Sequence, residues 1–204
     1  MGLMEKEIIL FDFDDTLFSK IEYKKNLRSN LARICEATEK EIFCFEEKYF
    51  ESLIKSDDFK IDDFLQKSSQ KFNKNIQLED FNSDKLGIYS GALFSDSIST
   101  LNNLKDNFRL GIYSQGFNSL QRIKIKSSGI ESFFDKELIY ISRNKLDPKF
   151  VEKLPDGATI VDDKKEVIEK LHPLKKFKLC WLSRVNNEKF PGVKTIKSLL
   201  EIAK

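Results

Sequence analysis

The chain has few of the residues from which metal–thiolate and histidine-based sites are built. Its 204 residues include one histidine, His172, and three cysteines, Cys35, Cys44 and Cys180, with no Cys-x-x-Cys pair. A zinc site or a serine–histidine triad is therefore hard to build, especially because His172 precedes Pro173 at an expected helix end. Acid–base chemistry must come from carboxylates. We expect all three cysteines to be core side chains of a protein in a reducing, cytoplasmic setting.

The sequence also lacks a charge excess and a long apolar run. Lysine and arginine number 35, aspartate and glutamate 33, and the formal net charge is +2. This balance gives no electrostatic reason to expect nucleic acid or an anionic membrane as a partner. The longest apolar runs fall far below the ~20 residues that cross a bilayer. We therefore predict a cytoplasmic protein with no nucleic-acid or membrane partner, and the oligomeric state stays open.

Glycine and proline are absent between Gly2 and Gly87. From about residue 18 to residue 85, apolar residues recur at spacings of three and four, which is the helical period. Thr38 and Glu41 form a capping box, so a helix should begin near Glu39. A strand-to-strand crossover needs one helix and this stretch holds three or four, which favours an inserted helical cap over residues 18–85; the helical layer of a single domain is the simpler alternative. The apolar positions are Ile21, Leu27, Leu31, Ile34, Ile42, Phe45, Tyr49, Leu53, Ile61, Phe64, Leu65 and Phe72.

In the rest of the chain, residues 1–17 and 86–204, short apolar strands alternate with helices. This alternation predicts an α/β domain with a doubly wound parallel sheet. The expected strands are residues 8–11, 109–113, 138–141, 158–161 and 177–182. The expected helices are residues 97–104, capped by Asp96, then 118–129, 148–154, a helix ending near 171, and 193–202.

The first strand runs directly into three carboxylates and a hydroxyl, Asp12, Asp14, Asp15 and Thr16. In an extended backbone, residues two apart leave on the same side, so Asp12 and Asp14 should lie close together. Two carboxylates at that distance repel each other unless a cation lies beside them. An acidic turn after a buried strand is the plainer reading. The carboxyl ends of parallel strands are where such sheets bind ligands, and this favours a functional site.

The run Asp12-Phe13-Asp14-Asp15-Thr16 resembles the first motif, Asp-x-Asp-x-Thr, of the haloacid-dehalogenase-like (HAD) superfamily of phosphatases and phosphotransferases. The resemblance implies a Rossmann-like core with an inserted helical cap of the C1 type. It also implies that Asp12 attacks phosphorus and that Asp14 is the general acid and base. Asp15 would face away and shape the turn.

The family's other three motifs have matches in the same order along the chain. Residues 110–114, ending in Ser114, resemble the second motif, whose hydroxyl holds a phosphate oxygen, although Ser114 could equally cap the next helix. Lys145 resembles the lysine of the third motif. The family often has proline directly after that lysine, whereas Leu146 stands here, so Lys149 is the reserve candidate.

Residues 159–163, ending in Asp162 and Asp163, resemble the fourth motif, which supplies a further magnesium ligand. We assign Asp163 as the ligand and Asp162 as its neighbour, with the two roles open to exchange and Glu166 as a possible supporting acid. The resemblance thus implies Mg2+ as cofactor, held by Asp12, the Asp14 carbonyl and this pair.

The implied activity is that of a Mg2+-dependent phosphatase, a phosphoric monoester hydrolase acting on a small phosphorylated metabolite through an aspartyl phosphate. Thr16, Ser114 and Lys145 would bind the phosphate group. Two alternatives remain: a phosphotransferase or mutase, and a non-catalytic domain of the same fold that binds a phosphorylated ligand.

Overall fold

The computed structural model describes residues 6–53, 59–185 and 188–202 of the chain. By its internal contacts the chain divides into two compact units. The core unit consists of Met1–Ser19, Leu93–Gly116 and Ile130–Lys204, and the helical unit of Lys20–Ala92 and Phe117–Gly129. The domain bounds expected from the sequence stay a prediction.

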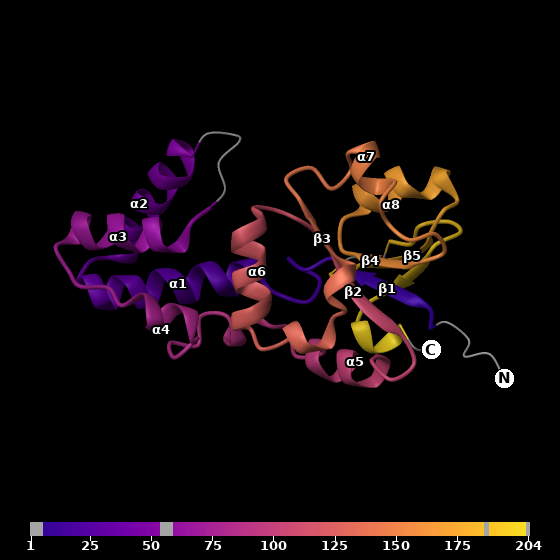
Figure 1. Ribbon diagram of the computed structural model, residues 1–204, viewed down its shortest axis with the longest axis horizontal. Coiled ribbons are helices and arrows are strands. Elements are labelled where there is room, and N and C mark those ends of the chain that lie inside the picture. Colours follow the sequence, from indigo (N-terminus) through magenta and orange to yellow (C-terminus); the bar gives the residue numbers. More distant parts are fainter. Residues whose placement is uncertain (1–5, 54–58, 186–187, 203–204) are drawn as a thin grey trace. The chain divides into compact units, whose positions relative to one another are not determined.

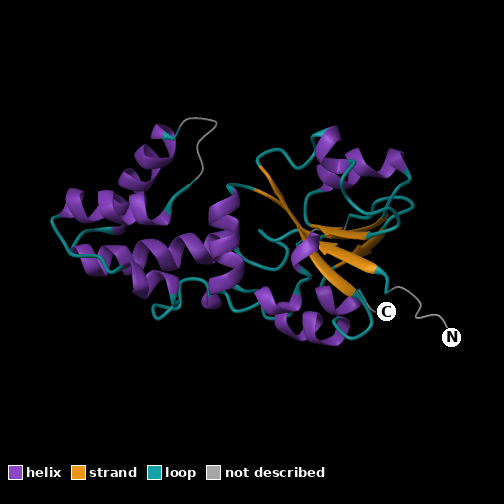
Figure 2. Cartoon of the chain, in the orientation of Figure 1, coloured by secondary structure: helices purple, strands orange, loops and turns teal. Residues whose placement is uncertain are grey.

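Over its described residues, the core unit is built on one sheet of six strands, all parallel (Figure 1, Figure 2). The strand order is β3-β2-β1-β4-β5-β6, with β1 in the interior of the sheet. This topology confirms the doubly wound α/β fold expected from the alternating pattern. The strands are β1 Ile8–Phe11, β2 Arg109–Gln115, β3 Ile139–Ser142, β4 Thr159–Asp162, β5 Lys178–Leu182 and β6 Lys194–Ile196.

Helices cover both faces of this sheet (Figure 1). On one face lie α7, Pro148–Val151, and α8, Lys165–Leu171; on the other lie α5, Ser97–Leu104, and the short 3₁₀ turn η5, Leu199–Glu201. Side chains of β1 and β4 are almost wholly buried, as expected for strands covered on both sides. Three further 3₁₀ turns of the core unit are η2 Glu131–Phe133, η3 Lys136–Leu138 and η4 His172–Leu174.

Gly111 in β2 lets this strand lie close to both β1 and the backbone at Leu138. A Cβ atom at Gly111 would lie 2.4 Å from the carbonyl oxygen of Leu138 and 2.7 Å from a methyl carbon of Leu10. No side chain fits into that space without moving backbone. The absence of a side chain at Gly111 therefore allows β2 to pack closely beside β1, the strand that leads to the acidic loop.

The helical unit contains the helices expected from the glycine-free stretch, together with one from a later segment. The Thr38 capping box is present as expected, since its hydroxyl accepts from the Glu41 amide and the Glu41 carboxylate accepts from the Thr38 amide. One expected apolar position, Ile21, is 76% exposed. The elements are α1 Lys20–Cys35, α2 Glu39–Ser52, α3 Ile61–Phe72, α4 Leu78–Asn82, η1 Ser90–Ala92 and α6 Asn118–Ser127.

Two expected helices of the core unit differ from the structure. The helix expected over residues 193–202 is wrong: this segment forms strand β6 and the turn η5. Val193, Thr195 and Ile196 are β-branched and suit a strand, and a capping box between Ser198 and Glu201 begins a new turn after it. The helix opened by Pro148 ends at Val151 and not at residue 154.

The cysteine prediction is also corrected in part. Cys35 and Cys180 are buried free thiols, whereas Cys44 is exposed. Cys44 lies four residues from Lys40 and from Lys48 on α2, so it shares their solvent-facing side of the helix. Within the described ranges, no helix is long and apolar enough to cross a lipid bilayer.

Candidate active site

The register between β1 and β4 brings two carboxylates together at the carboxyl edge of the sheet. Phe11 pairs with Val161, and the Asp12 amide donates to the Val161 carbonyl oxygen over 2.8 Å. Asp12 and Asp162, which follow this pair, are therefore neighbours. Their exposed fractions are 3% and 0%, so both carboxylates are nearly removed from water.

Lys145 lies between these two carboxylates. Its Nζ donates to Asp12 Oδ1 over 2.8 Å and to Asp162 Oδ2 over 2.5 Å, and the side chain is fully buried. The Tyr113 hydroxyl donates to the backbone carbonyl of Lys145, and the Tyr113 ring centroid lies 5.3 Å from the ammonium. The reserve candidate Lys149 is exposed on α7, so the structure brings Lys145 and not Lys149 to the acids.

Burial and the close charges shift the ionisation of these groups. Burial alone would lower the pKa of Lys145, but the Asp12 and Asp162 carboxylates together outweigh it and raise that pKa above its ordinary value. Lys145 is therefore an ammonium ion. Burial, and then the charge of Asp12, raise the pKa of both Asp162 and Asp163. Because burial and mutual repulsion disfavour the charged forms of these acids, a cation bound among them would be stabilising.

The donor atoms at this edge fit a hard divalent cation. One carboxylate oxygen from each of Asp12, Asp162 and Asp163 lies within 4.8 Å of the others. Both Asp162 oxygens already have partners, since Oδ2 accepts from Lys145 and Oδ1 from the Lys164 amide. Asp163 Oδ1 is buried and has no hydrogen-bond partner among the described residues. Mg2+ prefers oxygen ligands, and an unpartnered buried carboxylate oxygen is what such a site needs.

The loop after β1 is a tight turn that places Asp14 and Thr16. The Phe13 carbonyl oxygen accepts from the amides of residues 17 and 18, each over 3.0 Å. Asp15 has φ = 67°, a left-handed conformation that aspartate tolerates better than most residues. Asp14 is half-buried, and Thr16 is fully buried with a hydroxyl that has no partner among the described residues.

Asp15 shapes this turn, as expected, but the expectation that it faces away is wrong. It lines a cavity of about 300 Å3 together with Asp163 and Trp181. Its charge is a further cause of the raised pKa of Asp163, after burial and Asp12. The loop therefore adds another negative charge to the acidic edge of the sheet.

Comparison of the whole chain with known proteins identifies the fold. No protein-family model matches it, and no curated protein matches it by sequence. The HAD-hydrolase YfnB of Bacillus subtilis, whose structure has bound magnesium, matches at 15% identity and a TM-score of 0.60 over 97% of this chain and 96% of that chain. A HAD phosphatase from Thermococcus onnurineus matches at 21% identity and a TM-score of 0.54, over 97% and 95%. The chain has the HAD-like fold. The L-2-haloacid dehalogenase RSc1362 shares it at 15% identity and a TM-score of 0.51, over 97% and 96%.

In this HAD-like fold, Ser114 lies inside the sheet and is not the cap of a helix. It is fully buried in β2, opposite Ile141 of β3, and Phe117 is the residue that precedes α6. The capping alternative for Ser114 is therefore wrong. Glu166, expected as a supporting acid, is exposed on α8 and lines a separate groove with Leu146 and Lys170. Glu166 does not belong to the acidic cluster.

Two residues that support the site of this HAD-like fold were missed from the sequence. Arg184, just after β5, donates from Nη2 to the Thr16 carbonyl oxygen over 2.9 Å and forms a two-pronged ion pair with Asp96 at 2.9 and 3.0 Å. Asp96 was expected only as a helix cap, but its carboxylate does not bond to the first turn of α5. Because parallel strands end at one edge, the polar residue Arg184 after β5 could have been placed at the acidic edge of the sheet from the sequence.

Tyr113 is the second residue that was missed. Its hydroxyl donates to the Lys145 carbonyl oxygen, but its sequence context is that of an ordinary core aromatic residue.

Proposed function

We propose that this chain is a Mg2+-dependent phosphatase that hydrolyses a small phosphorylated metabolite through an aspartyl-phosphate intermediate. The observation that carries the proposal is the buried arrangement of Asp12, Lys145 and Asp162, with Asp163 beside it offering a buried oxygen that lacks a partner. Phosphoryl transfer depends mostly on positioning and on neutralising charge, and these groups supply both.

Asp12 is the nucleophile in this proposal. One of its carboxylate oxygens forms a bond to phosphorus while the bond from phosphorus to the leaving oxygen breaks, and Asp14 gives its proton to that oxygen. Asp14 then takes a proton from the water that attacks the aspartyl phosphate. This second displacement releases inorganic phosphate and restores the carboxylate of Asp12.

The remaining residues hold charge and position. Lys145, an ammonium ion already bonded to Asp12 Oδ1, orients the nucleophile and offsets charge on the phosphoryl oxygens. Thr16 and Ser114 would donate hydrogen bonds to those oxygens. Asp12, the Asp14 carbonyl and Asp163 would hold Mg2+, with Asp162 as the alternative ligand to Asp163; when bound, the ion supplies positive charge against the transferring group.

Asp14 also separates this proposal from dehalogenation, the activity named for some proteins with the same fold. A dehalogenation has no oxygen leaving group that needs a proton, whereas phosphate-ester cleavage does. A second acid placed two residues after the nucleophile therefore favours phosphoryl transfer. A phosphotransferase or mutase would use the same residues and differ only in the molecule that accepts the phosphoryl group. A non-catalytic binding domain would need no general acid or base.

A panel of phosphorylated metabolites, assayed for released phosphate with and without Mg2+, tests the proposal. We expect phosphate release from at least one small phosphoester with Mg2+, and none in chelator. Transfer of the phosphoryl group to an added alcohol or sugar would identify a phosphotransferase. Binding without turnover would identify a binding domain, and full activity in chelator would overturn the metal assignment.

A further inference from the structure

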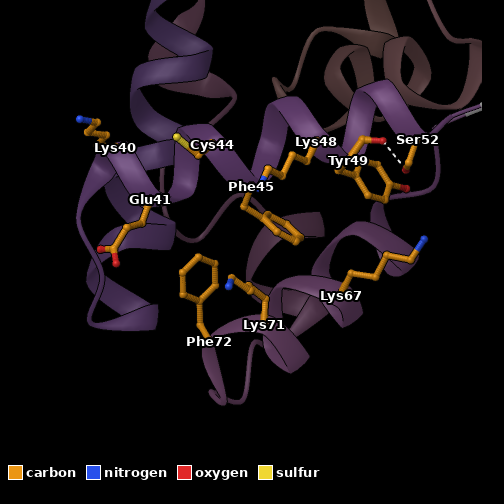
Figure 3. Close-up of a pocket in the computed structure, with 10 residues that line it drawn as sticks. All are labelled: Lys40, Glu41, Cys44, Phe45, Lys48, Tyr49, Ser52, Lys67, Lys71 and Phe72. Carbon is orange, nitrogen blue, oxygen red and sulfur yellow. Dashed lines mark hydrogen bonds between the residues drawn. The ribbon is translucent and has the colours of Figure 1, made fainter.

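A groove between α2 and α3 of the helical unit has no part in the proposed reaction. Its volume is about 770 Å3, within the range of sites that bind organic ligands and peptide side chains. Its described lining residues all belong to residues 40–52 and 67–72 of the helical unit. Figure 3 shows aromatic rings between the two helices and lysine side chains extending from both of them.

The floor of the groove is aromatic. The Phe45 and Phe72 rings meet edge to face at 5.9 Å, and Phe45 also lies 5.6 Å from Phe64. Tyr49 packs on Phe64 at 5.1 Å and continues the floor along α2. Phe45 and Phe72 are only half-buried, so part of each ring faces the groove. Burying such ring surface against another apolar surface is favourable.

Lysines stand along both sides of this floor. On α2, Lys40 and Lys48 are two helical turns apart, about 12 Å along the axis, with Cys44 between them. On α3, Lys67 and Lys71 are one turn apart. All four lysines are exposed. We call this site the lysine-lined groove.

The described lining residues of the groove carry a net positive charge. Within the described part of the chain, Lys40 and Lys48 form no ion pair, while Lys67 pairs at 2.9 Å with a carboxylate one turn earlier in α3. Glu41 is the one acid among the described lining residues, and its carboxylate is already bonded to the amide and hydroxyl of Thr38 at 2.8 and 2.7 Å. A complementary partner therefore brings negative charge with it.

We propose that the lysine-lined groove binds an amphipathic helix of a partner protein, with its apolar stripe on the aromatic floor and Asp or Glu residues on both flanks. A small amphipathic anion carries its charge at one end, whereas this groove presents charge on both sides and over two turns of α2. A helix with carboxylates on either side of an apolar stripe matches that pattern.

The test uses the full chain and a synthetic helical peptide of about 15 residues, with a leucine stripe flanked by glutamates. Cys44 lies in the groove, and Cys35 and Cys180 are buried, so alkylation of Cys44 reports occupancy. We expect saturable binding, a reduction of at least tenfold in the Cys44 alkylation rate at saturation, and weaker binding at high salt. A scrambled peptide of the same composition should bind at least tenfold more weakly.

Charge reversal locates the binding surface. The double variant K48E/K71E should weaken binding of the peptide at least tenfold, whereas K136E/K153E, at exposed positions of the core unit, should not. Neutral substitutions K40Q/K48Q provide a second, milder variant in case the reversal disturbs folding, which circular dichroism would detect.

Three results would overturn the proposal. Peptide affinity that is the same in K48E/K71E and in the unaltered chain would place binding elsewhere. A dimer in sedimentation that these substitutions dissociate would make a second copy of this chain the occupant. Equal protection of Cys44 by octanoate would assign the groove to small amphipathic anions.

Discussion

Lys145 is the residue on which the charge balance of the buried site depends. Its ammonium is bonded to both Asp12 and Asp162, and all three side chains are at most 4% exposed. Removing one partner of a buried ion pair leaves the other charge without compensation, which costs more than the pair itself contributes. Here the loss would leave two adjacent carboxylates in a poorly solvated space.

We therefore expect Lys145→Met to lower the free energy of unfolding by about 3–5 kcal/mol and to abolish phosphate release. Lys149→Met is the matched control, because Lys149 is exposed, and it should change stability by no more than about 0.5 kcal/mol. Urea unfolding followed by fluorescence measures the stability of both variants, and a phosphate-release assay measures their activity. Equal effects of the two substitutions would contradict the assignment of Lys145.

The proposed nucleophile is tested by Asp12→Asn. Turnover should fall at least about 10³-fold while the circular dichroism spectrum is unchanged, because the amide keeps the shape of the side chain but cannot form the acyl phosphate. Asp15→Asn is the control: asparagine tolerates the left-handed conformation at this position, and activity should persist. If Asp12→Asn retained near-normal turnover, water would have to attack phosphorus directly.

The sequence could predict the acids of the site but not the residues that hold them. Asp12 and Asp163 follow apolar strands and Asp162 ends one. Parallel strands bring their carboxyl ends to one edge, so the proximity of these acids follows from local pattern. Arg184 and Tyr113 act across long sequence distances, through the Thr16 and Lys145 carbonyls. No local pattern shows which backbone oxygen a distant side chain will reach.

At the level of elements, the Asp96 carboxylate joins three parts of the core unit. Besides its ion pair with Arg184, it accepts from the Ser198 hydroxyl at 2.7 Å and from the Leu199 amide at 3.0 Å. Arg184 in turn lies over the Phe94 ring at 4.1 Å. The start of α5, the end of β5 and the turn η5 are therefore connected through one buried acid.

This connection should make stability depend on pH. Burial alone would raise the pKa of Asp96, but Arg184, Ser198 and the Leu199 amide outweigh it and hold the pKa below its ordinary value. A lowered folded-state pKa gives stability that is present above the unfolded pKa of about 4 and is lost as the pH falls toward the folded pKa.

Asp96→Asn should therefore cost about 3–5 kcal/mol at pH 7, because it leaves the Arg184 charge unpaired, and the difference from the unaltered chain should shrink below about pH 4. Urea unfolding of both proteins across this range measures the difference. A cost that does not change with pH would show that Asp96 acts through packing and not through its charge.

The fit of β2 against its neighbours gives a further prediction. Gly111→Ala would place a methyl group 2.4 Å from the Leu138 carbonyl oxygen, so backbone must move, and we expect a loss of about 3 kcal/mol or more. Gly157→Ala is the control, because no atom lies within 4 Å of the added methyl and only its φ of +75° is unfavourable, worth about 1–2 kcal/mol. Thermal unfolding compares the two, and equal losses would contradict the packing argument.

The elements themselves were predictable to different degrees. Strands β1, β4 and β5 are mostly apolar and buried, so their composition alone indicates strands covered on both faces. β6 has only three residues and was mistaken for part of a helix, because its apolar residues and those of η5 together mimic a helical spacing. Pairing with β5, which the local sequence does not contain, decided that segment.

At the level of the whole molecule, the proposed metal site belongs to one unit only. Trp181, the single tryptophan, is buried in β5 and donates from its ring nitrogen to the Asp163 carbonyl oxygen over 3.0 Å. Its fluorescence therefore reports on the core unit beside the acidic cluster. Far-UV circular dichroism, by contrast, is weighted toward the helical unit.

Mg2+ should raise the urea midpoint measured by Trp181 fluorescence more than the midpoint measured by circular dichroism. At a concentration of 100 times Kd, the stabilisation of the core unit is about 2.7 kcal/mol. Asp163→Asn should remove most of the shift. The absence of any shift in the unaltered chain would contradict a metal site, and identical shifts by both probes would show that the two units unfold together.

The position of β1 in the sheet also determines when Asp12, the proposed nucleophile, is put in place during synthesis. Ile9 pairs with Leu110 on one side and with Thr159 on the other, so both partners of β1 leave the ribosome long after it does. Closing such long loops has an entropic cost and makes folding slow. Until β4 is available, a nascent chain carries an apolar strand with an unpaired edge, which is prone to aggregation and is a target for chaperones. Asp12 is thus synthesised before its partners, Lys145 and Asp162, and gains their contacts only after β4 has been made.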